Sequence, residues 1–343
     1  MNKDVKRILL EDVAREAGVS TASVSRVLNR APHVSERLRL KVETAVDRLG
    51  YVPDGTARAL ASRRIGAIGA LVPTLDNPVF SAMIDSLERR LKQYDCRLLI
   101  ATYRYSLAEE VESLRTLIQQ GIDGAVLIGH DHLPATLRLF QQYELPYLTC
   151  WHSEEDPDWP SIGFDNAAPA RGLAEHLVAL GHCNIGVVTA PVEGNDRARA
   201  RLQGFRQAIE AAGHTLPDDH VVTVEYGIEE GAAAFAKLMR LAPRPTAILC
   251  GNDVLAFGVM FAAQRAGIAI PEQLSVTGFD DLTQARFMQP ALTTVATPAD
   301  EVGRLVADAL VTRIQGQATP HRQVLEARVV LRDSTAPPRP AFA

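Results

Sequence analysis

The sequence has few cysteines and no long apolar run. Its four cysteines, Cys96, Cys150, Cys183 and Cys250, are far apart and form no Cys-x-x-Cys pair. This spacing excludes the usual zinc and redox motifs, and it is typical of small buried side chains in a reducing compartment. No segment approaches the roughly 18 consecutive apolar residues that a membrane helix needs. The first ten residues also lack the apolar stretch of a secretory signal, so we expect a cytoplasmic protein without a membrane partner.

The motifs of the common enzyme classes are absent as well. The sequence contains no Gly-rich phosphate loop, no Gly-x-Ser-x-Gly, no His-Glu-x-x-His and no calcium loop. His130 and His132 flank Asp131, but no further ligand residues gather near them in the sequence, which favours a solvated turn over a metal site. We therefore expect a protein that is not an enzyme, with no cofactor and no metal.

Only the N-terminal part of the chain carries a net positive charge. Residues 1–64 contain 13 Lys and Arg against 8 Asp and Glu, a net charge of +5. The whole chain carries −5, which leaves −10 for residues 65–343. A short basic segment on a long acidic one indicates that only the N-terminal part meets a polyanion such as DNA.

Three helical patterns fill residues 10–50. The first ends at Gly18, and Ser20 is a natural N-cap for the second. Ser35 is the expected N-cap of the third, which ends at Gly50. The link between the first two helices is only about three residues long, which sets them at a steep angle.

The second of these helices has the features of a DNA-reading helix. It begins with small polar residues, and a helix of this size fits the major groove with its first turn facing base edges. Arg26 is suited to a bidentate contact with guanine. The alternative is a small three-helix bundle with a purely structural role. We expect base contacts from Thr21, Ala22, Ser25 and Arg26, and phosphate contacts from Ser20 and Asn29.

From residue 65 onward, short apolar strands alternate with amphipathic helices. This alternation predicts parallel sheets with helices on both faces, and about eight strands over roughly 280 residues divide into two lobes. The strand near 145–150 is expected to end the first sheet, and the strand at 185–189 to begin the second. A helix at 298–315 and a strand at 324–331 are expected to return the chain to the first lobe.

The segment DVAREAGVSTASVSRVLN resembles the helix-turn-helix signature of the LacI/GalR family. The segment HVSERLRLKVETAVDRLGYVPDGTARALASRR resembles that family's third helix and hinge, and the similarity continues to about residue 334. The resemblance implies an all-α helix-turn-helix head and an α/β, two-lobed domain like a periplasmic binding protein, with two parallel sheets. The implied divisions are a head at 1–52, a hinge helix at 53–64 and the two-lobed domain at 65–334, its first lobe at about 65–162 plus 297–334 and its second at about 163–296.

The family resemblance also assigns roles in the hinge. It places the hinge helix in the minor groove, with Leu60 inserted between the central base pairs and Ala57 beside it. Arg58 is then expected near a phosphate. Apolar wedges of this kind unstack a base step and bend the DNA. The family usually has asparagine where this chain has Asp54, and a carboxylate there repels phosphate.

Several motifs resemble the ligand loops of the family's two lobes. These motifs are DNPVF, GFDN, RARARLQGF, CGND and GFDD. Asp and Asn side chains form paired hydrogen bonds with vicinal hydroxyls, Arg binds a hydroxyl or carboxylate, and an aromatic face stacks on a sugar ring. For Asn166 a helix cap is an equal alternative, and for Trp151 and Tyr103 packing is favoured over a ligand contact. The resemblance implies an effector site formed by Asn77, Phe80, Asn166, Arg201, Asn252 and Asp280.

These observations predict a sequence-specific transcriptional regulator. We expect a repressor of a carbohydrate or sugar-acid catabolic operon that binds a pseudo-palindromic operator as a homodimer and is released by a small-molecule inducer. The segments GFDN and ATYRY resemble the gluconate-repressor branch somewhat more than the purine or lactose branches, which favours a sugar acid over a neutral sugar. The alternatives are a regulator controlled by a corepressor or a protein partner and, from another class, a solute-binding protein without a role on DNA.

Overall fold

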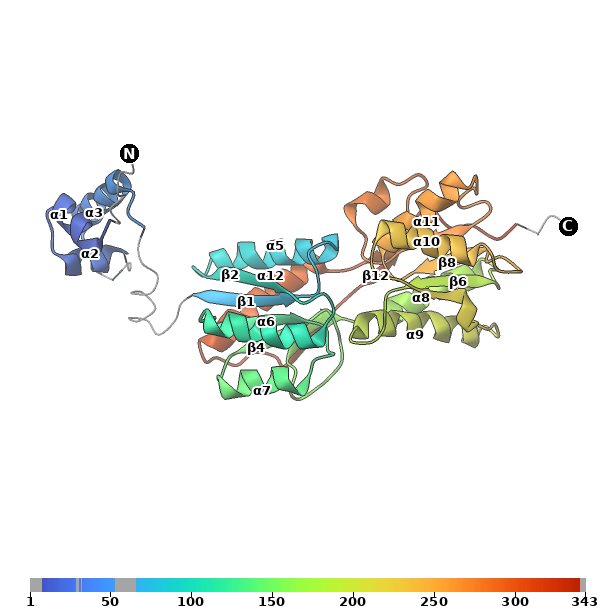
Figure 1. Cartoon of the computed structure of the whole chain (residues 1–343), viewed down its shortest axis with the longest axis horizontal. Helices are drawn as coiled ribbons and strands as arrows, with labels where there is room; N and C mark the ends of the chain where they lie inside the picture. Colours follow the sequence, from blue (N-terminus) through green and yellow to red (C-terminus); the bar gives the residue numbers. More distant parts are fainter. Residues whose placement is uncertain (1–7, 29–30, 32, 53–65, 340–343) are drawn as a thin grey trace, which may run out of the picture. The chain divides into compact units, whose positions relative to one another are not determined.

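The computed structural model describes residues 8–28, 31, 33–52 and 66–339 (Figure 1). The chain divides into two compact units, Met1–Gly66 and Ala67–Ala343. The predicted hinge helix at 53–64, with Ala57, Arg58 and Leu60, lies outside the described residues, and so does Asn29.

The described residues of the first unit form three helices with their own core. The predicted caps are confirmed: Ser20 Oγ accepts a hydrogen bond from Ser23 N (3.2 Å), and Ser35 Oγ accepts one from Leu38 N (3.4 Å). Gly50 follows the third helix with φ 62°, the left-handed conformation that ends helices. The helices are α1 (Leu10–Ala17), α2 (Thr21–Leu28) and α3 (Glu36–Leu49), and their buried residues are Val13, Ala14, Ala17, Val24, Val27, Val42 and Ala45.

The second unit begins with a lobe built on a six-stranded parallel sheet. Every residue of its strand β1 is buried, as expected for a strand with helices on both sides. In spatial order the strands are β11 (Arg322–Leu325), β5 (Ser161–Phe164), β4 (Tyr147–Cys150), β3 (Gly124–Ile128), β1 (Ala67–Val72) and β2 (Arg97–Thr102). One face is covered by α5 (Pro78–Lys92) and α12 (Ala299–Ile314), and the other by α6 (Leu107–Gln119) and α7 (Pro134–Gln142) (Figure 1).

The second lobe has a four-stranded parallel sheet and the same layered arrangement. In spatial order its strands are β7 (Val221–Thr223), β6 (Ile185–Thr189), β8 (Ala247–Cys250) and β9 (Ser275–Thr277). Helices α10 (Ile228–Leu238) and α11 (Asp253–Arg265) pack together on one face, and α8 (Ala167–Ala179) and α9 (Asp196–Ala211) on the other (Figure 1). Strands β10 (Thr294–Ala296) and β12 (Arg328–Val330) form a separate antiparallel pair.

The structure differs from the predicted lobes at two places. Strand β5 follows β4 in the first sheet, so the strand near 145–150 does not end that sheet. The segment predicted as one strand at 324–331 is two strands, because the chain leaves the first sheet after β11 and pairs with β10 as β12. Ser334 then donates to Val276 O (2.6 Å), so the last part of the chain packs on the second lobe. The chain thus passes between the lobes three times, after β5, after β10 and after β11.

Paired helices in each lobe approach closely at glycines. A Cβ atom on Gly303 of α12 would lie 2.4 Å from the backbone oxygen of Met83 in α5. A Cβ atom on Gly204 of α9 would lie 2.3 Å from the backbone oxygen of Ala167 in α8. Contacts this short with backbone atoms force the helices apart, so larger residues do not fit at these crossings.

We predict that Gly303→Ala lowers the free energy of unfolding by about 1–3 kcal/mol, the usual effect of overpacking a core. Gly172→Ala in α8 is the matched control, because its Cβ atom would meet only the side chain of Val329, at 3.3 Å. Urea unfolding of both variants measures the difference. Equal stability of the two variants would show that the α5–α12 crossing accommodates a methyl group.

Candidate functional site

The α2 helix presents small polar residues on the surface of the first unit. Ser20, Thr21, Ala22 and Arg26 are exposed and Ser25 is partly exposed, whereas Val24 and Val27 of the same helix are buried in the core. The residues predicted to contact bases therefore lie on the face of α2 that the core does not use. This is the arrangement that a helix entering the major groove requires.

In the second unit, Arg201 lies at the centre of a buried polar network. Its Nε donates to Asn166 Oδ1 (2.9 Å) and its Nη1 to Gly251 O (2.7 Å). Its Nη2 lies 3.7 Å from Asp280 Oδ1, and its guanidinium carbon lies 3.9 Å from the centre of the Phe279 ring. Burying a guanidinium is costly unless its charge and its N–H groups have partners. These contacts bring together residues of four of the predicted ligand motifs.

Asp280 has hydrogen-bonding capacity that the protein does not use. The residue is 5% exposed, and neither carboxylate oxygen has a hydrogen-bond partner among the described residues. Burial raises the pKa of Asp280 to about 7, and the charge of Arg201 opposes the shift. Its φ of 119° is unusual for a residue other than glycine. Unpaired buried acceptors and backbone strain of this kind are typical of binding sites.

Asp253 holds the loop that carries Asp280. Its Oδ1 accepts a hydrogen bond from Thr294 Oγ1 (2.5 Å), and its Oδ2 accepts one from Leu282 N (2.7 Å). Burial raises the pKa of Asp253 to about 7, and the charge of Asp280 adds to the shift. Asp253 therefore ties the start of α11 to Leu282, just after Asp280, and to the start of β10.

Asn252 precedes Asp253 and is completely buried. Its Oδ1 caps α11 by accepting from Leu255 N (2.9 Å), while its Nδ2 has no hydrogen-bond partner among the described residues. It follows Gly251, whose carbonyl binds Arg201. The predicted ligand residue is thus a helix cap with one unused donor.

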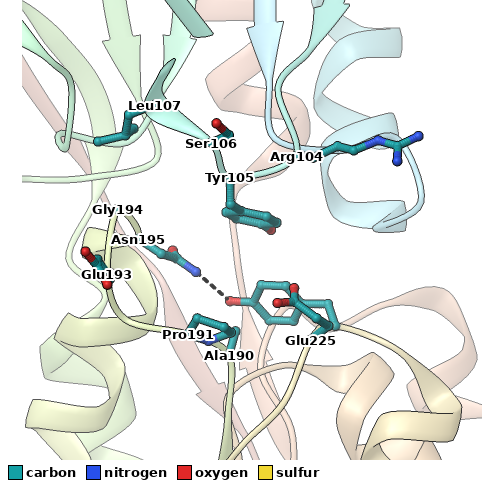
Figure 2. Close-up of a pocket in the computed structure, with 11 residues that line it drawn as sticks. Arg104, Tyr105, Ser106, Leu107, Ala190, Pro191, Glu193, Gly194, Asn195 and Glu225 are labelled. Atoms are coloured by element: carbon teal, nitrogen blue, oxygen red, sulfur yellow. Dashed lines mark hydrogen bonds between the residues drawn. The ribbon is translucent and has the colours of Figure 1, made fainter. Parts of the chain in front are cut away.

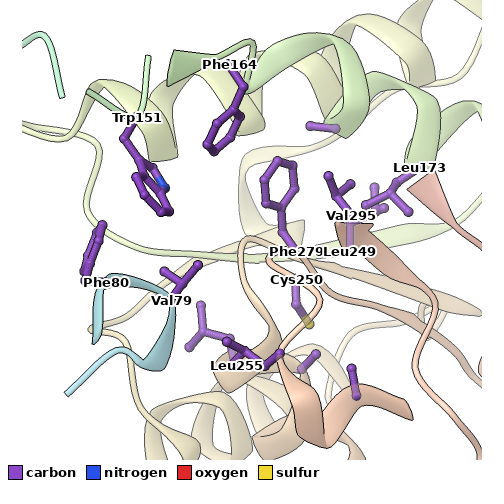
Figure 3. Close-up of a cluster of buried hydrophobic side chains, with 14 of the residues drawn as sticks. Val79, Phe80, Trp151, Phe164, Leu173, Leu249, Cys250, Leu255, Phe279 and Val295 are labelled. Carbon is purple, nitrogen blue, oxygen red and sulfur yellow. The ribbon is translucent and has the colours of Figure 1, made fainter. Parts of the chain in front are cut away.

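Three aromatic rings pack together in the buried hydrophobic cluster of the second unit (Figure 3). The ring of Phe80 packs edge-on against Trp151, with centroids 5.5 Å apart, and Trp151 packs in the same way against Phe164. Asn166 Nδ2 donates to the backbone oxygen of Trp151 (2.9 Å), which connects the rings to Arg201. The indole Nε1 of Trp151 is buried without a hydrogen-bond partner among the described residues. The sequence favoured packing over a ligand contact for Trp151. In the structure Trp151 is packed, and its indole N–H is in addition an unused hydrogen-bond donor.

Asn77 is the predicted site residue with the weakest connection to the others. Its Oδ1 caps α5 by accepting from Val79 N (3.2 Å). Val79 lines a cavity of about 510 Å³ that Asp280 also lines. The structure therefore brings Asn166, Arg201 and Asp280 into direct contact, joins Phe80 to them through Trp151, and places Asn252 and the start of α5 nearby.

The sequence did not predict the contacts between the lobes that Arg197 and Arg199 of α9 make. Arg199 binds both carboxylate oxygens of Asp131, at 2.8 and 2.7 Å. Arg197 is 4% exposed and donates to Ile128 O (3.3 Å), and Gly129 lies against its guanidinium. The available signal was the spacing of Arg197 and Arg201, which places both on one face of α9.

The loop with Asp131 is therefore not a solvated turn. His132, whose side chain is fully buried, makes hydrogen-bond contacts with Glu110 Oε1 and Oε2 (3.0 Å each) and with Gly129 O (3.1 Å). In the part of the chain that the structure describes, no group of three or more His, Cys, Asp or Glu residues is placed to hold a metal ion. No described helix is long and apolar enough to cross a membrane.

Known proteins are similar to this chain in sequence and architecture. Residues 9–54 match the bacterial regulatory proteins of the lacI family, and residues 174–335 match the periplasmic binding protein-like domain. The chain is 34% identical over 324 residues to the ribose operon repressor of Escherichia coli strain K12, which covers 94% of this chain and 97% of that protein.

Two solved structures are also similar. One is the lac repressor dimer bound to operator and the anti-inducer ONPF, with 29% identity and a TM-score of 0.83 over 96% of this chain and 100% of that one. The other is a LacI family transcriptional regulator from Enterococcus faecium with bound ribose, with 27% identity and a TM-score of 0.70 over 80% of this chain and 100% of that one.

We predict that Gly129→Ala loosens the contact between the lobes. The new Cβ atom would lie 1.8 Å from Arg197 Nη1, which would displace the guanidinium from Ile128 O. Gly213→Ala is the control, because Gly213 also has a positive φ (79°, against 94° at Gly129) but open space around its Cβ position. Acrylamide quenching of Trp151 fluorescence, in a Trp159→Phe background, is expected to rise only for Gly129→Ala. Equal quenching in the two variants would contradict the prediction.

We predict that the unfolding free energy falls between about pH 4 and pH 7. Over this range an unfolded chain releases the proton of Asp280, whereas the folded chain retains it because its pKa is about 7. Each unit by which the folded pKa exceeds the unfolded pKa changes the unfolding free energy by about 1.4 kcal/mol. Asp280→Asn is therefore expected to flatten the slope of the unfolding free energy against pH. Asp253 contributes in the same direction in both proteins. Urea unfolding across this range tests the change, with Asp219→Asn, at an exposed carboxylate, as the control. An unchanged slope in Asp280→Asn would refute it.

Proposed function

Because the chain belongs to the LacI family of bacterial regulatory proteins, we propose that it represses a carbohydrate-catabolic operon and is released by a small sugar or sugar acid. The first unit binds the operator through α2, and the second unit binds the effector between its lobes. The protein acts in the cytoplasm, where operator DNA lies. The observation that carries this proposal is the Arg201 network, which is buried and connected but leaves hydrogen-bonding atoms unused.

The unused atoms match the chemistry of a polyol. The carboxylate of Asp280 offers two acceptors, and the buried side chains of Asn252 and Trp151 each offer a donor. Neighbouring hydroxyl groups supply both donors and acceptors, and the aromatic rings suit the C–H face of a sugar. Arg201 suits either a hydroxyl or the carboxylate of a sugar acid. The ribose named for two of the similar proteins supports a carbohydrate effector.

The DNA half of the proposal rests on α2 and on charge. The exposed Thr21, Ala22 and Arg26 are proposed to read bases, together with Ser25, while Ser20 and Asn29 bind phosphate. The net charge of +5 in residues 1–64 attracts the DNA backbone. Leu60 is proposed to enter the minor groove, with Ala57 and Arg58 beside it. Asp54 is then expected to weaken the phosphate contact of the hinge.

A homodimer is proposed because it places two α2 helices on a pseudo-palindromic operator. The second lobe has an apolar surface suited to a second copy of the chain. Phe287 is 75% exposed and Phe261 is 41% exposed, beside an open cavity of about 430 Å³ that Met260 and Ile268 also line. The similar lac repressor structure is also a dimer.

Selection of DNA from a random pool by the full chain tests the regulator function. We expect enrichment of an inverted repeat, with specific binding at least tenfold weaker in Arg26→Ala. Lys41→Ala, at an exposed position of α3, serves as the control and is expected to keep the ratio of specific to non-specific binding. Failure to enrich any sequence would refute the proposal. A sugar that strengthens operator binding would instead assign the protein to the corepressor type.

We predict that Arg201→Ala abolishes the effector response and leaves operator binding intact. The substitution removes the group that joins Asn166, Gly251 and Asp280, whereas the α2 surface belongs to another unit. A thermal-shift screen against sugars and sugar acids gives the response, because a ligand that binds only the folded protein stabilises it by about 2.7 kcal/mol at a hundredfold excess over Kd. Arg206→Ala, further along α9, is the control. A retained response in Arg201→Ala would remove Arg201 from the site.

A further inference from the structure

His132 is placed so that both nitrogens of its ring face hydrogen-bond acceptors. Nδ1 lies 3.0 Å from each carboxylate oxygen of Glu110, and Nε2 lies 3.1 Å from the backbone oxygen of Gly129. The side chains of His132 and Glu110 are completely buried. A neutral imidazole carries one N–H, whereas an imidazolium carries two. The two contacts therefore need one proton more than a neutral ring beside a carboxylate holds, and an imidazolium supplies it.

The other groups around the ring also suit a positive charge. The ring of Trp159 lies beside it, with centroids 4.6 Å apart and planes inclined at 39°, and the π-system of an indole attracts a cation. Thr136 Oγ1 donates to Glu110 Oε1 (3.1 Å), so Glu110 acts as an acceptor toward Thr136 as well as toward His132. The surroundings of the ring thus consist of a carboxylate, a carbonyl and an aromatic system, all of which attract positive charge.

The other charged side chains packed around this loop pair with one another rather than with the ring. These pairs are Arg199 with Asp131 (2.7 Å), Arg197 with Asp196 (2.7 Å), His152 with Glu154 (3.0 Å) and His130 with Asp156 (3.6 Å). Tyr103 is also close, but burial raises its pKa, so it stays uncharged and donates from Oη to Ile128 O (3.3 Å). Among the described residues, Glu110 is therefore the carboxylate that answers the charge of His132.

The loop at 129–131, whose first carbonyl His132 holds, carries contacts with the second lobe. Asp131 binds Arg199 of α9 through both carboxylate oxygens, at 2.8 and 2.7 Å. Gly129 has a φ of 94°, and a glycine adopts several backbone conformations at little cost. The peptide group after Gly129 is therefore able to turn when nothing holds its oxygen. The contact from His132 Nε2 thus fixes the part of the loop that precedes Asp131.

Glu110 connects the same pair to a helix that also touches the second lobe. It lies in the first turn of α6, which begins at Leu107. A Cβ atom on Gly194 of the second lobe would lie 3.5 Å from Leu107 Cγ, and Figure 2 shows these two residues on facing loops. The buried pair of Glu110 and His132 thus joins two parts of the first lobe that meet the second.

We propose that His132 is a buried imidazolium that positions the 129–131 loop against the second lobe, so that the lobe arrangement seen here depends on one bound proton. Without that proton the ring keeps its N–H toward Glu110, and its bare Nε2 then faces the lone pairs of Gly129 O. The carbonyl turns away and takes Asp131 out of line with Arg199. A buried ion pair adds little net stability, so fixing one arrangement is its use here. The inference goes beyond the proposed function, because it holds for any effector that binds between the lobes.

Two measurements on the full chain test the bound proton, both in the Trp159→Phe background, which keeps an aromatic ring beside His132. Nitrogen-15 NMR of histidine-labelled protein, with the His132 signals identified by their loss in His132→Gln, is expected to show two protonated ring nitrogens at neutral pH. Acrylamide quenching of Trp151 is then followed as the pH is raised. We expect it to rise about twofold, with the same midpoint as the loss of the ring proton. A ring with one protonated nitrogen at neutral pH would overturn the proposal.

Glu110→Gln separates positioning by charge from packing alone. Its amide oxygen still accepts from Thr136, while its amide nitrogen donates to Nδ1 of His132, so a neutral ring satisfies Gly129 O through Nε2–H. This variant is expected to keep the low quenching of Trp151 at every pH and to lose the pH dependence. Glu109→Gln, at the neighbouring exposed carboxylate of α6, is the matched control and is expected to retain it. The same pH dependence in Glu110→Gln as in the parent protein would overturn the proposal, and operator binding by these proteins tests the proposed function separately.

Discussion

The buried guanidinium of Arg201 is the constraint on which the ligand-binding unit depends. A charge removed from water requires partners, and here the start of α8, the end of β8 and the loop after β9 each supply one. The start of α8 directly follows the crossing after β5, and Asp280 in the loop after β9 bridges to Ala296 of β10, which precedes the next crossing. The position of Arg201 therefore determines how the crossing segments and the ends of the second sheet meet.

The same network leaves part of its hydrogen-bonding capacity unused. Asp280 is close enough to Arg201 for charge attraction but accepts no hydrogen bond from it. Unsatisfied buried groups lower stability, so they persist where something else is gained from them. In this account the gain is ligand binding, and the ligand acts by stabilising one arrangement of the lobes over another. The contacts of Arg197 and Arg199 with the first lobe are those of the lobe arrangement seen in this structure.

Much of the fold was predictable because its signals are local. Helix caps at Ser20 and Ser35 and fully buried strands such as β1 are determined by residues close in the sequence. Strand β5 was missed because no helix separates it from β4, so it breaks the alternation of strands and helices on which the prediction relied. The division of 324–331 into two strands was missed because it follows from the crossing between lobes, which no local pattern encodes.

The candidate site was predictable to a similar degree. Family motifs led to Arg201, Asn166 and Asp280, which the structure brings together. The same motifs gave no indication of Gly129 or Arg197, whose importance arises only when the two lobes meet.

The most direct measurement is the affinity of the full chain for its selected operator, with and without the effector, at one fixed salt concentration. Ligand binding between the lobes is expected to weaken operator binding at least tenfold, because the effector stabilises an arrangement of the second unit that disfavours the DNA complex. An effector that saturates the second unit and leaves operator affinity unchanged would contradict the coupling between the two units.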